Sequence, residues 1–117
     1  MKQVELVARI RTEIVDANLH EYRELFATQP PAAASDSEFK RALALHASLS
    51  TEQRDALFRL MRRVMVDTVS SMLGVLDGGA WFGGPYEGFK LTTVSGSEKL
   101  NEGLQDLFLG MEESDPR

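Results

Sequence analysis

Asp67 and Asp77 are the two carboxylates of this sequence whose surroundings suggest a chemical role. Asp67 lies in the most apolar part of a long periodic segment, four residues after Arg63, so the two side chains share one helix face. A carboxylate among apolar residues is stable only when it is paired or hydrogen-bonded. We therefore interpret Arg63 and Asp67 as structural polar residues, and a small enzyme using Asp67 and Asp77 as a less favoured alternative.

Motifs for catalysis, metal binding or cofactor binding are missing from the sequence. His20 and Glu24 share a helix face, but the zinc motif HExxH needs a histidine where Glu24 stands. The chain has no cysteine, which excludes disulfides and thiolate metal sites. Its glycines form neither a dinucleotide-binding nor a P-loop pattern, and GxSxG is absent. We expect no metal and no cofactor, and these patterns give no support to catalysis.

Aromatic side chains are concentrated in a glycine-rich stretch after residue 79. Trp81, Phe82 and Tyr86 are the candidates for interaction, and Phe89 follows them. Such residues dominate the binding energy of protein interfaces, but they also cover hydrophobic cores. Both interpretations stay open at the level of sequence.

Acidic residues accumulate toward the C-terminus. The formal net charge of the chain is −5, and residues 98–117 carry most of it. This distribution disfavours a nucleic-acid ligand, which needs a basic footprint. Glu98, Glu102 and Asp106 are candidates for steering a basic protein partner, and residues 112–117 are expected to form a frayed acidic tail.

One helix spanning Ser50–Gly79 is expected to organise the fold. Ser50 and Gln53 have the spacing of a capping box, and Gly78 and Gly79 are typical of a helix end. Apolar residues recur at helical spacing and extend over most sides of this segment. That breadth is typical of a central helix covered by others.

The other elements are shorter. The periodicity predicts helices over residues 1–28, 37–48 and from about 97 to 111, the last capped by Ser95 or Ser97. Residues 89–94 alternate and are rich in β-formers, so we expect a strand there, with residues 80–82 as its hairpin partner. The expected fold is mainly α: a single domain of 117 residues, with three or four helices bundled around the central one and a short β-hairpin or strand near 80–94.

The segment from Leu49 to Leu109 resembles a family of small, mostly uncharacterised bacterial proteins. The resemblance rests on residues 49–54 (LSTEQR), 66–70 (VDTVS), 76–78 (LDG), 89–91 (FKL) and 104–109 (LQDLFL). The layout is similar to that of immunity proteins of bacterial toxin systems. The resemblance implies a protein partner, in its sharpest form a basic toxin domain.

Together these features lead us to expect a non-catalytic protein-interaction module. Its sharper form is an immunity-type inhibitor of a bacterial toxin. The alternative is a structural or housekeeping homodimer that uses exposed apolar surface. No run reaches the roughly 18 apolar residues of a membrane span, and no signal peptide is evident, so we expect a cytoplasmic protein without membrane contact.

Overall fold

The longest element of the computed structural model, which describes residues 1–115, is α4 (Thr51–Asp77). The capping box is present: Gln53 N donates to Ser50 Oγ at 3.1 Å, and Ser50 N donates to Gln53 Oε1 at 2.9 Å. Gly78 ends the helix with φ +83°, a conformation that glycine adopts without steric cost. The predicted bounds of the central helix are confirmed.

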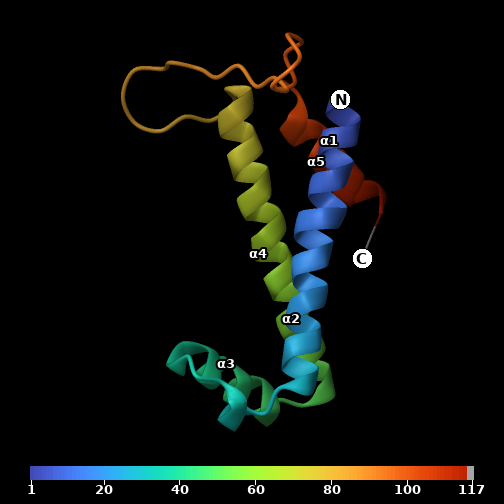
Figure 1. Ribbon diagram of the computed structural model, residues 1–117, viewed down its shortest axis with the longest axis vertical. Helices are drawn as coiled ribbons and strands as arrows, with labels where there is room; N and C mark the ends of the chain where they lie inside the picture. Colours follow the sequence, from blue (N-terminus) through green and yellow to red (C-terminus); the bar gives the residue numbers. More distant parts are fainter. Residues whose placement is uncertain (116–117) are drawn as a thin grey trace.

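The N-terminal residues form one continuous helical rod antiparallel to α4 (Figure 1). It consists of α1 (Gln3–Arg9), a π-helical segment η1 (Ile10–Asp16) and α2 (Ala17–Thr28). Pro30 and Pro31 then turn the chain through the short η2 (Pro31–Ala33), since proline cannot continue the helix. The predicted helix over residues 1–28 is confirmed, and its π-helical segment is a feature that periodicity does not reveal.

The helix α3 (Ser37–Ser48) projects from the end of the molecule where α2 stops and α4 begins (Figure 1). Asp36 caps it by accepting a hydrogen bond from Glu38 N at 3.0 Å. His46 is buried and stacks on Phe26, with the ring centroids 5.0 Å apart, and Phe58 packs edge-on against both rings. This aromatic cluster fixes α3 to α2 and α4.

The last helix, α5 (Leu104–Ser114), begins later than expected. Neither Ser95 nor Ser97 caps it. Asp77 at the end of α4 does so instead: its carboxylate accepts hydrogen bonds from Glu102 N at 2.7 Å and Gln105 N at 2.8 Å. A cap supplied by a distant helix cannot be recognised from local spacing, which explains the error.

The main core lies where α5 packs against both α1 and α4. Its buried members are Val7, Val15, Leu73, Leu104 and Phe108. Ser70 and Gly74 allow the close approach of α5 because their side chains are small. Gln105 Nε2 donates to Ser70 O at 3.0 Å, and a Cβ on Gly74 would lie 2.9 Å from this nitrogen.

The predicted hairpin is wrong: no β-strand occurs in residues 1–115. The side chain of buried Asn101 takes the place of a strand partner. Its Oδ1 accepts from Leu91 N at 2.9 Å, and its Nδ2 donates to Phe89 O at 2.8 Å and Leu76 O at 2.5 Å. The backbone of residues 89–91 is therefore hydrogen-bonded by the side chain of Asn101 and by Leu100 N, which donates to Leu91 O at 2.7 Å.

Glu112 joins three helices through a partly buried ion-pair network. Its Oε1 lies 2.7 Å from Arg11 Nε and 2.6 Å from Arg62 Nη2, and Arg62 also contacts Asp16 at 2.6 Å. The exposed fractions of the Arg11, Arg62 and Glu112 side chains are 8%, 12% and 17%. Residues 112–114 thus belong to α5, which differs from the expected frayed tail; residues 116–117 of that tail lie outside the described part of the chain.

Removing the Glu112 carboxylate should destabilise the fold strongly. Glu112→Ala leaves two arginines without their shared partner in a poorly hydrated site, which should lower the free energy of unfolding by about 3 kcal/mol or more. Glu113→Ala, which changes an exposed neighbour in the same helix, is the matched control and should have little effect. Urea denaturation of the three proteins measures the difference; equal stabilities would contradict the structural role.

The aromatic cluster should make stability depend on pH. Burial, and secondarily the charge of Arg54, lower the pKa of His46 below its ordinary value of 6.5. Above pH 6.5 His46 is neutral in both the folded and the unfolded protein. Below it the unfolded chain binds the proton first, so the free energy of unfolding should fall, by at most about 1.4 kcal/mol per pH unit.

His46→Gln should remove this dependence from thermal melts taken between pH 7 and pH 5. His20→Gln, which changes the exposed histidine of α2, is the control that should keep it. If the pH dependence of stability were unchanged in His46→Gln, groups other than His46 would be its cause.

Candidate functional site

The side of α4 that points away from α2 and α5 is largely apolar and exposed, although Leu57, Met61 and Val75 on it are partly buried. We call it the outer face, and its members are Leu57, Leu60, Met61, Val64, Thr68, Ser71, Met72 and Val75. Leu60, Val64 and Met72 are 60%, 55% and 63% exposed. The expectation that other helices cover α4 on most sides is therefore wrong, because α3 and the loop after Gly79 project from its two ends and leave the middle open (Figure 1).

Arg63 and Asp67 lie beside the outer face rather than in the interior. Arg63 Nε is 3.3 Å from Asp67 Oδ2, so the expected ion pair is present. Its side chains are 77% and 63% exposed, however, and a solvated pair one turn apart contributes about 0.5 kcal/mol or less. The apolar residues around Asp67 in the sequence mark an uncovered face, which the sequence alone cannot distinguish from a buried one.

The aromatic residues after Gly79 pack on one another. The half-buried Trp81 is central: its ring centroid lies 4.9 Å from that of Tyr86, 5.4 Å from Phe89 and 5.5 Å from Phe82. Its Nε1 donates to Pro85 O at 3.1 Å. Phe82 and Tyr86 remain 65% and 62% exposed. The cluster is separate from the main core, so Trp81 organises the loop and its neighbours face solvent.

A groove runs between this loop and the end of α4. It has a volume of about 390 Å³ and an almost wholly apolar lining, which consists of Ser71, Met72, Val75, Leu76, Phe82 and Phe89. A shallower depression lined in part by Val64 and Thr68 shares Ser71 and Met72 with it. The outer face and the loop therefore form one continuous apolar surface.

The acidic candidates do not form a patch with the aromatic ones. Glu98 is exposed near Met1, and Asp106 is exposed in the first turn of α5 beside Arg11. Glu102 contacts Lys99 Nζ at 2.6 Å, and its backbone serves the α5 cap described above. The cavities that contain Glu98 and Asp106 are lined by none of the loop aromatics.

The two carboxylates considered for catalysis are also apart. Asp77 is occupied by capping α5, and Asp67 stands ten residues earlier, about 15 Å along the helix axis. They cannot act on one substrate group as an acid–base pair, because such a pair must reach the same atoms.

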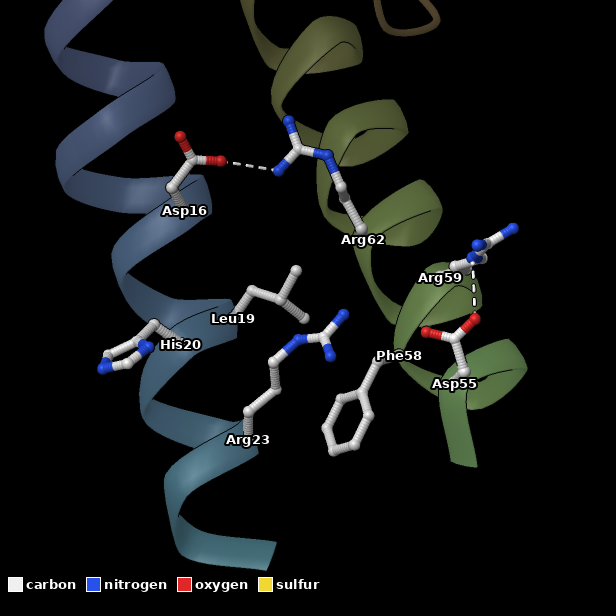
Figure 2. A pocket seen from close by; sticks show the side chains of 8 residues that line it. All are labelled: Asp16, Leu19, His20, Arg23, Asp55, Phe58, Arg59 and Arg62. Carbon is white, nitrogen blue, oxygen red and sulfur yellow. Dashed lines mark hydrogen bonds and ion pairs between the residues drawn. The ribbon is translucent and has the colours of Figure 1, made fainter. Parts of the chain in front are cut away.

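A second cavity of about 470 Å³ lies between α2 and α4, and Figure 2 shows the charged side chains of its lining together with Leu19 and Phe58. Arg62 contacts Asp16 here, and Arg59 contacts Asp55 at 3.1 Å. The guanidinium of Arg23 lies over the ring of Phe58, 4.7 Å from its centroid. The arginines are thus engaged by neighbouring side chains, and the arrangement is that of a helix–helix contact rather than a prepared anion site.

Residues 1–115 contain no group of three histidine, aspartate or glutamate side chains placed to hold a metal ion. In the same range, no helix has both the length and the apolar character required to cross a bilayer.

Two residues with large structural roles were missed in the sequence, Asn101 and Glu112. Asn101 gives no local signal, because its partners are backbone groups up to 25 positions away. For Glu112 the signal was available: Arg11 and Arg62 occupy core-facing positions in their helices, and buried cations require a partner.

Comparison of the chain with protein-family models, with curated proteins and with solved structures finds no match.

Trp81 and Phe108 should respond differently to truncation. Phe108 is fully buried in the core, so Phe108→Ala should cost about 3–5 kcal/mol of unfolding free energy. Trp81 belongs to a half-exposed loop cluster, so Trp81→Ala should cost less than about 2 kcal/mol. Chemical denaturation compares them, and equal losses would show that the loop cluster is part of the core.

Proposed function

We propose that this chain is a non-catalytic protein-interaction module that binds its partner through the outer face of α4 and the adjoining aromatic loop. The observation that carries the proposal is the continuity of the apolar surface from Val64 to Phe89. Exposed apolar surface of this kind, bordered by charged residues, is typical of protein interfaces.

The composition of the surface supports this proposal. Aromatic residues and methionine are enriched in the cores of interfaces, and Met72, Phe82 and Tyr86 are all more than half exposed. Trp81 stiffens the loop from within, which lowers the conformational entropy lost when a partner binds. The cavity between α2 and α4 has neither an exposed methionine nor a stiffened aromatic loop, and Arg59 and Arg62 in its lining are paired with carboxylates.

An immunity-type inhibitor of a bacterial toxin is the more specific form of the proposal. It draws on the resemblance of residues 49–109 to small bacterial proteins and on the net charge of −5, which would favour a basic toxin domain. The exposed carboxylates of Glu98 and Asp106 would then act on the association rate rather than at the centre of the contact.

Site-specific photo-crosslinking tests the interaction surface and captures the partner directly. A photoreactive phenylalanine analogue at position 82, in cells of the source organism, should give one discrete protein adduct, because this side chain is 65% exposed in the groove. The same analogue at position 22, an exposed aromatic site on α2, is the matched control and should give none. Adducts at neither position, or at both alike, would contradict the proposal.

A further inference from the structure

The protein exposes more surface than its size requires. Its accessible surface is 8011 Å², whereas a compact monomer of 13.0 kDa exposes about 6,300 Å². Its radius of gyration is 17.8 Å, against about 13 Å for a compact chain of this length. The surplus of about 1,700 Å² per chain is about twice the roughly 800 Å² that each partner contributes to a standard protein–protein interface.

The outer face of α4 has the spacing of a helix–helix seam. Leu57, Met61, Val64, Thr68, Ser71 and Val75 follow one another at alternating intervals of four and three residues. The five intervals average 3.6 residues, the repeat of a straight α-helix, so the six side chains form one stripe along which a second helix can pack. The residues of α4 that contact the main core, such as Val66, Val69 and Leu73, lie on the opposite side.

The seam is symmetric about its midpoint. Each seam position before residue 66 has a counterpart at the same distance after it: 64 matches 68, 61 matches 71 and 57 matches 75. If a second copy packs antiparallel about a twofold axis at this point, Met61 faces Ser71, Val64 faces Thr68 and Leu57 faces Val75. Twofold dimers use such self-complementary surfaces, in which one patch meets its own copy.

Large side chains lie in both halves of the outer face. Leu60 and Val64 stand before position 66 and Met72 after it, and all three are more than half exposed. Val64, Thr68, Ser71 and Met72 also line the shallow depression, which the groove walled by Phe82 and Phe89 continues. The twofold axis would place Leu60 of each copy opposite Met72 of the other, so that apolar side chains meet across the pair.

Charge is compatible with this packing. Arg63 and Asp67 border the seam on one side, both largely exposed. In the antiparallel arrangement this border of one copy lies against the same border of the other copy. Each Asp67 would then lie between its own Arg63 and the Arg63 of the other copy. The border is electrically neutral in the pair.

We propose that the partner bound by the outer face is a second copy of this chain, held by antiparallel packing of the two α4 helices about position 66. This inference rests on the proposed interaction function and specifies its partner. The loop aromatics Phe82 and Phe89 would then form the ends of the dimer interface.

Solution mass is the first test. Sedimentation velocity at about 100 μM should give about 26 kDa, twice the mass of one chain. Val64→Glu places two unpaired carboxylates in the seam, so its dissociation constant should rise at least about 100-fold and its mass should fall to that of one chain. The side chain is 55% exposed in the monomer, so the helical circular dichroism should be retained.

Ile14→Glu is the matched control, since Ile14 is a β-branched residue that is 49% exposed on η1, away from the seam. This variant should remain dimeric. A mass of 13.0 kDa for the unmodified protein, or equal dissociation by both variants, would overturn the inference.

Cysteine pairs test the direction of packing, and the absence of natural cysteines makes the result unambiguous. A mixture of Met61→Cys and Ser71→Cys proteins should form the mixed disulfide, because facing Cα atoms within about 6 Å can be bridged. Ser71→Cys alone should crosslink slowly, whereas a parallel pair would crosslink it readily and refute the register.

These results also separate the two proposals. If the adduct at position 82 contains a different protein and the mass is that of one chain, the interaction function stands and the second copy is excluded. If position 82 gives no adduct, both fail.

Discussion

Glu112 is the group on which the arrangement of the long helices depends. A single carboxylate oxygen lies within 2.7 Å of guanidinium nitrogens from Arg11 and Arg62, so α5, η1 and α4 meet at one point. Because ions removed from water are stable only when paired, this contact specifies one relative placement of the three helices. Asp77 and Asn101 fix the other end of α5 and the loop by the same logic, with carboxylate and amide groups that satisfy backbone partners.

This mode of assembly has a consequence for α4. The network and the core occupy one side of the helix, where Arg62, Val69 and Leu73 lie. The chain has too few remaining elements to cover the other side, because α3 is fixed at one end by the aromatic cluster and the loop folds around Trp81 at the other. An apolar stripe in the middle of a 27-residue helix therefore stays in contact with water. Such a surface is costly to leave hydrated, which is the physical reason to assign it to binding.

The sequence predicted those parts of the structure that are determined locally. Ser50, Gln53 and Gly78 defined α4, because caps act within one turn. The errors arose where distant groups decide. The side chain of Asn101, rather than a second strand, hydrogen-bonds Leu91, and Asp77, rather than a serine, caps α5. Apolar periodicity identified the outer face of α4 but could not tell exposure from burial, and for that reason Asp67 was expected in the interior.

Of the interaction candidates, Phe82 lines the groove and Tyr86 is exposed beside it, whereas Glu102 serves the fold.

The methyl groups of the five methionines offer the most direct measurement of the central claim, that α4 uses one side for the fold and the other for a second copy. Met61 and Met72 lie on the outer face, whereas Met65 and Met111 pack against the core. In methyl NMR spectra recorded over a dilution series, the signals of Met61 and Met72 should shift with protein concentration while those of Met65 and Met111 stay nearly constant. Outer-face methyls that remain exposed and unshifted at every concentration, or core methyls that shift equally, would contradict the account.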